Sequence, residues 1–216
     1  AASMRVCLQV APLLFCLFGG NLEANPVLGE DFERFNTSSS TVGESVELME
    51  FFSYSCLGCY QIGPDIDRWL LSKDQIVNFE LVPIVKGERS RRLAQMFFTL
   101  ELMGHLAAMH YEVFSAIHDK GENLWELGTR KYWIESKGID AEQFEEISNS
   151  DRVSKRIEEA RELGDFFHVI TTPTLIVDRR YWTSAGMIQS RDRLASVLDY
   201  LLEQASLNRQ SMTQSP

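Results

Sequence analysis

Two cysteines separated by two residues are the most chemically informative feature of the sequence. Cys56 and Cys59 follow an apolar segment that predicts a buried strand, and they precede a stretch with helical spacing. This order places Cys56 at a helix N-terminus, where the first-turn N–H groups and the helix dipole favour an anion and lower the pKa of a thiol. Cys59, one turn later, is within disulfide reach and more deeply covered. The pair therefore predicts dithiol–disulfide exchange, with Cys56 as nucleophile and Cys59 as resolving thiol.

A structural disulfide or a metal site could also account for a pair of this spacing. A disulfide that closes so short a loop constrains the unfolded chain little, so stability is a poor reason for it. A zinc or iron–sulfur site usually takes four ligands, and the remaining cysteines, Cys7 and Cys16, lie in a segment that we expect to be removed. The histidines lack a compact ligand spacing and are expected on helix surfaces or in the core: His105, His110, His118 and His168. We therefore expect no metal and no cofactor.

The amino end predicts an export signal. Residues 1–3 are interpreted as a cloning remnant, and a basic residue then precedes the nearly apolar stretch 6–18, which is too short to span a bilayer comfortably. Ala24 is the best small residue for cleavage, so residues 1–24 are predicted to comprise the remnant and a signal peptide. An uncleaved membrane anchor and a lipid-modified Cys16 are the alternatives. Cleavage would leave a single Cys-x-x-Cys pair in an exported chain.

The sequence around the cysteines predicts a strand–helix–strand unit. Residues 46–53 carry apolar side chains on both faces, as in a central strand covered on two sides. Residues 56–71 have helical spacing, and residues 76–82 predict a second strand that ends near Pro83, which cannot donate to a ladder. This order implies a parallel strand pair joined by a crossover.

The second half of the chain predicts a helical block followed by a hairpin and a last helix. Residues 91–167 repeat apolar side chains at helical spacing and predict four or five helices, one of them capped by Asp140. The hairpin is expected to turn at Arg179-Arg180, and the last helix to be capped by Ser190. The remaining predictions are two hairpin strands and a polar tail, at residues 174–177, 181–184 and 208–216.

Two motifs in combination resemble the thioredoxin-fold disulfide oxidoreductases, and among them the DsbA-like proteins. They are Glu50-Phe51-Phe52-Ser53-Tyr54-Ser55-Cys56-Leu57-Gly58-Cys59-Tyr60 and Thr171-Thr172-Pro173-Thr174-Leu175. The resemblance covers nearly the whole chain after residue 24, and it implies an α/β thioredoxin fold with an inserted helical domain. The domains that it implies are a discontinuous thioredoxin-like domain at 25–86 and 166–216, and the insertion at 87–165.

The resemblance also implies roles for individual residues. Pro173 would be a cis-proline facing the disulfide, and the Thr172 backbone would pair with an extended peptide. Glu50 matches a buried acidic residue of the family, with a raised pKa, that relays a proton to or from Cys59; a solvent-facing Glu50 is the alternative. His168 could line the same face, with a core or surface place as its alternative. The implied substrate-binding residues are Leu57, Gly58, Thr172 and Pro173.

The implied function is that of an exported thiol:disulfide oxidoreductase that introduces disulfides into other polypeptides. Its implied partners are unfolded or reduced secreted polypeptides and a quinone-linked membrane reoxidant of the DsbB type, in a bacterial periplasm. The chain itself would not be transmembrane once the signal is cleaved. A formal charge of −10 argues against nucleic acid as a partner.

The sequence leaves two alternative functions open. The family typically has Pro-His between its cysteines, whereas Leu57-Gly58 provides no ring donor for the thiolate, so a reductase or isomerase is possible. A chaperone-like assembly factor that binds peptides, with incidental cysteines, belongs to a different class. Exchanging Cys56 for Ser would separate a peptide binder from an oxidoreductase.

Overall fold

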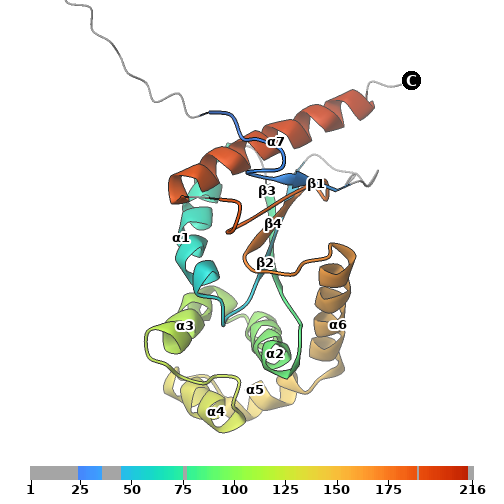
Figure 1. Ribbon diagram of the computed structural model, residues 1–216. Coiled ribbons are helices and arrows are strands. Elements are labelled where there is room, and N and C mark those ends of the chain that lie inside the picture. Colours follow the sequence, from blue (N-terminus) through green and yellow to red (C-terminus); the bar gives the residue numbers. More distant parts are fainter. Residues whose placement is uncertain (1–23, 36–44, 75–76, 189, 214–216) are drawn as a thin grey trace, which may run out of the picture.

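A mixed five-stranded sheet forms the centre of the computed structural model, which describes residues 24–35, 45–74, 77–188 and 190–213. The strand order is β1-β5-β4-β2-β3, so that β2 lies between a parallel neighbour, β3, and an antiparallel neighbour, β4 (Figure 1). The strands are β1 (Glu33–Arg34), β2 (Val46–Phe52), β3 (Val77–Pro83), β4 (Thr174–Val177) and β5 (Tyr181–Ser184).

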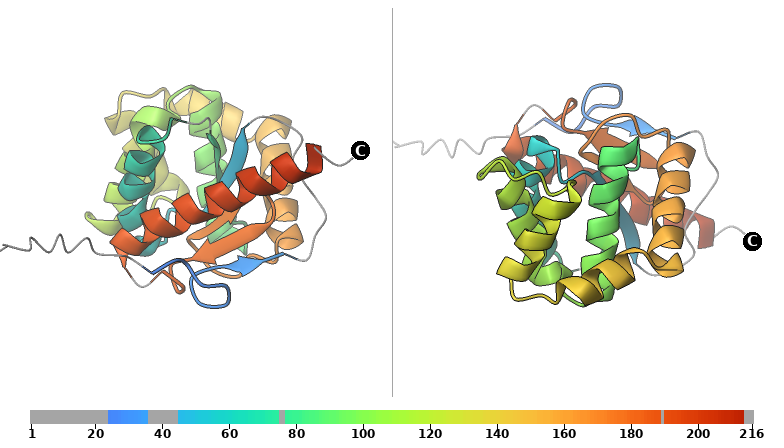
Figure 2. Two further views of the ribbon diagram at one scale, coloured as in Figure 1. Left: turned by 90° about the horizontal axis from the view of Figure 1, so that it is seen from above. Right: turned by 90° about the horizontal axis from the view of Figure 1, so that it is seen from below.

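The described residues also form seven helices. They are α1 (Leu57–Leu71), α2 (Glu88–Leu102), α3 (Leu106–His118), α4 (Leu127–Ser136), α5 (Ala141–Ser148), α6 (Asp151–Phe166) and α7 (Arg191–Thr213). The helices α2 to α6 lie between β3 and β4 in the chain and gather at one end of the sheet. Seen from above, α7 crosses the sheet, and seen from below, the helical block lies in front of it (Figure 2).

Strand β2 contributes to two hydrophobic cores. Met49 and Phe51 pack with the helical block, whereas Val46 and Leu48 pack with residues of α1 and α7. Because successive strand residues point to opposite faces, both faces of β2 are covered, which explains why apolar side chains occupy both of them. Glu50 shares the face of Val46 and Leu48, and therefore points toward α1.

Most predicted elements are confirmed. Strands 174–177 and 181–184 have the predicted bounds, β2 and β3 form the predicted parallel pair, and the helical block contains five helices. The Asp140 carboxylate accepts hydrogen bonds from the N–H groups of Glu142 and Gln143 at 2.9 and 3.0 Å, and the Ser190 hydroxyl accepts one from the N–H of Arg193 at 3.2 Å. Both predicted caps are therefore present. The short strand β1 was not predicted.

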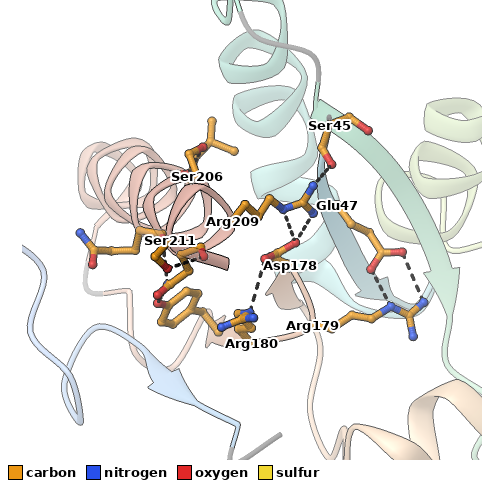
Figure 3. A network of polar contacts seen from close by, with 12 residues as sticks. Ser45, Glu47, Asp178, Arg179, Arg180, Ser206, Arg209 and Ser211 are labelled. Carbon is orange, nitrogen blue, oxygen red and sulfur yellow. Dashed lines mark hydrogen bonds and ion pairs between the residues drawn. The ribbon is translucent and has the colours of Figure 1, made fainter. Parts of the chain in front are cut away.

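The polar tail predicted at 208–216 is wrong for residues 208–213, because α7 continues to Thr213. Asn208 donates a hydrogen bond to the hydroxyl of Tyr181 at 2.8 Å. Arg209 donates to the carbonyl of Ser45 at 2.7 Å and, through Nε, to the carboxylate of Asp178 at 3.0 Å (Figure 3). These partners anchor a polar turn of helix to the sheet.

Asp178 also belongs to the turn between β4 and β5. This turn begins one residue before the predicted Arg179-Arg180. Asp178 and Arg179 have positive φ values of 53° and 55°, and the N–H of Arg180 donates to the carbonyl of Val177 at 3.0 Å. Two positive φ values in a hydrogen-bonded turn fit the twist of a hairpin. Arg179 is held by an ion pair with Glu47, with 2.8 Å between Nε and Oε2.

The predicted signal peptide, with Cys7 and Cys16, lies outside the described residues apart from Ala24. Across the ranges that the structure covers, no helix has both the length and the apolar character needed to cross a membrane.

Candidate active site

Cys56 is the N-cap residue of α1, as its place between strand and helix predicted. Its backbone is extended, with φ −94° and ψ 109°, and its sulfur accepts a hydrogen bond from the N–H of Cys59 at 3.1 Å. The same sulfur lies 3.3 Å from the carbonyl oxygen of Thr172, to which the thiol can donate. Both cysteines are free thiols, so the geometry is that of the reduced protein.

This environment lowers the pKa of Cys56 to about 6. The largest cause is a hydrogen bond from the thiol of Cys59, and burial partly opposes it. Further donors are the Thr172 side chain and the N–H groups of Cys59 and Gly58. Because hydrogen bonds to the charged form favour it, Cys56 is mostly a thiolate at neutral pH.

Cys59 has the opposite character. Only 1% of its surface is exposed, and burial raises the pKa of its thiol, with the nearby Cys56 adding to the shift. The pair therefore consists of a thiolate at the helix tip and a shielded thiol that donates to it. This asymmetry is what a nucleophile and a resolving thiol require.

The alkylation rate of Cys56 in the reduced protein is expected to follow a single titration near pH 6. The reason is that the thiolate is the reacting species, so the rate rises with the thiolate fraction and levels off above that pH. Iodoacetamide kinetics from pH 4 to 9, with the modified residue identified by mass spectrometry, measure this profile. A rate at neutral pH no higher than that of an ordinary free thiol would contradict the site geometry.

The segment bearing Pro173 lies directly against the cysteine motif. The Thr172–Pro173 peptide bond is cis, as the resemblance implied. A Cβ atom added to Gly58 would lie 3.3 Å from Cδ of Pro173 and 3.7 Å from the sulfur of Cys56, so a larger side chain there would press on the proline ring. Leu57, in contrast, is 52% exposed beside Cys56. The structure thus brings together all four residues predicted to bind substrate, which we call the cis-proline patch: Leu57, Gly58, Thr172 and Pro173.

Glu50 is buried, with 3% of its surface exposed, so the alternative of a solvent-facing side chain is wrong. Burial raises the pKa of its carboxyl to about 8, and the charges of Asp67 and Cys56 add to the shift. Its carboxyl is therefore mostly protonated at neutral pH. Glu50 adds to the raised pKa of Cys59, and both residues line the cavity described below.

His168 does not share the environment of Glu50. It follows the end of α6 with a positive φ of 51°, and its side chain is exposed. His110, in contrast, lies near the active site: its Nδ1 is 3.0 Å from the hydroxyl of the buried Tyr54, and burial lowers the pKa of its ring to about 4. His110 is therefore neutral at physiological pH, and its Nδ1 can accept the Tyr54 hydrogen bond.

A cavity of about 470 Å³ is lined by Cys59 and by none of the four residues of the cis-proline patch. Its lining comes from β2, β3, α1, α2 and α3, and includes two of the predicted site residues, Glu50 and Cys59. The other lining residues are Phe52, Gly63, Asp67, Phe79, Leu81, Glu101, Gly104, Leu106, Ala107, His110, Tyr111 and Phe114. Sequence reasoning missed these residues as a group, because helical spacing shows which of them are apolar but not that five elements meet around one space.

Comparison with known proteins agrees with the fold and with the chemistry of this site. The family model described as a DSBA-like thioredoxin domain matches residues 64–201. The chain belongs to this family. Two curated relatives are the thiol:disulfide interchange proteins DsbA of Azotobacter vinelandii, 31% identical over 159 residues, and of Bordetella pertussis, 32% identical over 146 residues. The alignments cover 74% of both chains in the first comparison, and 68% of this chain and 69% of the relative in the second.

The fold of this DsbA-like chain also matches solved structures of the family. The crystal structure of Pseudomonas aeruginosa DsbA superposes with a TM-score of 0.77 and 27% identity, covering 84% of this chain and 95% of that one. The predicted thioredoxin-type α/β fold with helices inserted between strands is thus confirmed. The chain is a thiol:disulfide oxidoreductase of the DsbA-like type.

Proposed function

We propose that this DsbA-like chain is a thiol oxidase whose Cys56–Cys59 disulfide accepts two electrons from a dithiol of another polypeptide. A substrate thiolate attacks the sulfur of Cys56, a mixed disulfide forms, and Cys59 leaves as a thiolate that takes up a proton. The second substrate thiolate then attacks the substrate sulfur and releases Cys56 as a thiolate. The substrate becomes a disulfide, and of its two protons one ends on Cys59 and one in solvent.

The observation that carries this proposal is the contrast between the two sulfurs. The sulfur of Cys56, with its pKa lowered to about 6, is a good leaving group in the last step. The sulfur of Cys59 is buried, so few groups other than Cys56 can react with it. A structural disulfide would need neither the acidified thiol nor its place at a helix tip.

The surface around the cis-proline patch supports a polypeptide as the substrate. Leu57, next to Cys56, and Ile170, three residues before Pro173, expose 52% and 88% of their surfaces. Exposed apolar side chains of this size favour unfolded chains over folded ones. The Thr172 backbone, next to the sulfur of Cys56, would pair with an extended peptide in the manner of an added strand. Substrate-binding roles for Leu57, Gly58, Thr172 and Pro173 are part of this proposal.

The direction of exchange is tested by the reduction potential. The lowered pKa of Cys56 lies between the values of about 3.5 for DsbA and about 7 for thioredoxin, and a more stable thiolate favours the reduced form. We therefore expect a potential between about −120 mV, as in DsbA, and about −270 mV, as in thioredoxin. Equilibration with glutathione buffers, followed by alkylation of the free thiols, measures it. A value at or below that of thioredoxin would instead favour the reductase or isomerase alternative.

The biological setting proposed for this activity is the periplasm. The predicted signal peptide and the single Cys-x-x-Cys pair after it support export, and an oxidising compartment is where a disulfide donor can act. Reduced secreted polypeptides would be the substrates. A quinone-linked membrane protein of the DsbB type would return the cysteines to the disulfide. We also propose that residues 87–165 form a helical domain inserted into a thioredoxin-like domain at 25–86 and 166–216.

A further inference from the structure

The segment that leads from α6 to the cis-proline patch is fixed where it begins. The end of α6 forms a Schellman motif, in which the N–H of His168 donates to the carbonyl of Asp165 at 3.1 Å. The N–H of Val169 donates to the carbonyl of Gly164 at 2.9 Å. His168 has a φ of 51°, the left-handed conformation that this motif requires and that glycine usually provides. Val169 is 4% exposed, so the chain leaves α6 through a buried residue whose N–H is bonded.

Lys86 holds the carbonyl of the same buried residue. Its ammonium group donates a hydrogen bond to the carbonyl oxygen of Val169, which lies 83 residues away in the sequence. Because Val169 is buried, this carbonyl has little access to water, and a charged donor makes a stronger hydrogen bond than a neutral one. The N–H of Lys86 donates to the hydroxyl of Ser90 at 2.7 Å. The lysine is therefore held at its backbone and bonded at its tip.

This contact joins the two connections of the helical block. Lys86 lies in the connection from β3 to α2, and Val169 lies in the connection from α6 to β4, which also carries the cis-proline. The first connection is itself bonded to the end of β2, since the N–H of Ile84 donates to the carbonyl of Phe52 at 2.9 Å. Lys86 thus ties the segment before the cis-proline to the backbone that leads into the cysteine motif.

Separate contacts hold the other end of this segment. The hydroxyl of Thr174 donates to the carbonyl of Thr171 at 2.9 Å. The carbonyl oxygen of Thr172 lies 3.3 Å from the sulfur of Cys56. Between Val169 and these contacts, the chain comes to the surface for three residues, which we call the presenting span: Ile170, Thr171 and Thr172. Both ends of the presenting span are therefore fixed.

Resting on the thiol-oxidase function proposed above, we propose that Lys86 is a positioning residue for the polypeptide substrate. By bonding the carbonyl of Val169, it holds the presenting span so that the backbone of Thr172 meets an extended peptide next to the sulfur of Cys56. A span that is ordered before the substrate arrives loses less conformational entropy on binding. Lys86 therefore raises the affinity for peptides without touching the reacting sulfurs.

This role differs from an electrostatic effect on the nucleophile. The pKa of Cys56 is lowered by hydrogen bonds, above all from Cys59, and the charge of Lys86 is not among its causes. Loss of the ammonium group should therefore weaken the reaction with a peptide, whose backbone pairs with the presenting span. It should not weaken the reaction with dithiothreitol, a small dithiol that has no peptide backbone.

Lys86→Met tests the proposal, because methionine is similar in length and lacks the donor. Oxidised protein is mixed either with a reduced peptide containing two cysteines or with dithiothreitol, quenched with acid and analysed by mass spectrometry for reduced protein. We expect the rate constant with the peptide to fall about tenfold, as for the loss of a hydrogen bond to a charged group, and the rate constant with dithiothreitol to stay unchanged. Lys86→Arg keeps a charged donor and should restore most of the rate with the peptide.

Lys131→Met is the matched control. Lys131 is an exposed lysine of α4 that forms an ion pair with Glu135 of the same helix at 4.0 Å, so its loss changes the net charge equally. This variant should react with the peptide as fast as the wild-type protein. Equal rates for Lys86→Met and Lys131→Met would refute the positioning role. An equal loss with peptide and with dithiothreitol would also refute it, because the cysteine motif itself would then be disturbed.

A modified peptide tests whether Lys86 acts through strand pairing. N-methylation of the amides beside the reacting cysteine removes donors that an added strand needs, so this peptide should react slowly with the wild-type protein. Lys86→Met should then slow it less than about twofold further, since the two changes remove the same interaction. A further loss of about tenfold would overturn the proposal. If the unmodified peptide fails to reduce even the wild-type protein, the thiol-oxidase function fails, and the role of Lys86 fails with it.

Discussion

Replacing Cys56 with serine is expected to abolish thiol oxidation, with a loss of more than about 1000-fold in the rate at which a reduced peptide acquires its disulfide. The hydroxyl of serine cannot form a mixed disulfide, and the remaining thiol of Cys59 is 1% exposed. Cys59→Ser should behave differently: Cys56 remains an accessible thiolate, so a peptide already activated as a disulfide is captured and stays bound. Peptide oxidation rates and mass spectrometry of the trapped adduct measure the two outcomes.

The same pair of variants distinguishes an oxidoreductase from a peptide-binding assembly factor. A binder with incidental cysteines would keep its effect on the refolding of a client protein in both variants. Refolding yield of a disulfide-containing client, measured with and without an added glutathione buffer, provides the comparison. Full activity of Cys56→Ser in the absence of that buffer would refute the thiol-oxidase function.

Exchanging Glu50 for glutamine is expected to stabilise the reduced protein by about 4 kcal/mol at pH 8. The pKa of Glu50 is raised from its usual 4.5 to about 8 in the folded state, chiefly by burial. The unfolded chain therefore loses its proton more readily than the folded chain. The contribution of Glu50 to wild-type stability is then greatest below about pH 4.5 and falls as pH rises toward about 8. Glutamine carries no such charge, so the difference between the two proteins grows over this interval.

Urea denaturation of both proteins from pH 4 to 9 measures this difference. The comparison near pH 4 is an internal control, because Glu50 is then mostly protonated in both states and the two proteins should be about equally stable. A constant difference across the whole range would show that Glu50 does not titrate as a buried carboxyl. Glutamine should also slow the exchange steps that move the proton of Cys59, since an amide cannot relay it.

The strands and helices were predictable where local chemistry determines them. The hairpin strands at 174–177 and 181–184, and the caps at Asp140 and Ser190, follow from local residue patterns, and the structure confirms each of them. The end of α7 was not predictable in this way. Residues after 207 are polar and have no apolar periodicity, and their helix depends on partners such as Asp178, which lie far away in the sequence.

The residues of the candidate site were likewise predictable only where the local sequence identifies them. Cys56, Cys59 and Pro173 stand in short motifs whose residue types and spacing carry the chemistry, so the sequence alone could identify them. The position of Glu50 followed from its apolar neighbours on β2, and its burial is confirmed. Gly63 and Tyr111 carry no local signal, because a glycine within a helix gains its meaning only from the ring that a second helix places against it.

The pairing of β2 with β4 has a consequence for how the polypeptide is made. These central strands join Leu48 to Val177 and Phe51 to Thr174, so the middle of the sheet unites the first quarter of the chain with the last. During synthesis, β2 emerges long before β4, so the backbone N–H and C=O groups that pair with β4 stay unpaired in the meantime. Pairings of such long sequence separation form slowly. Most of the chain must therefore be synthesised before β2 and β4 can pair. During that interval the polypeptide is still unfolded and could pass through a narrow translocation pore.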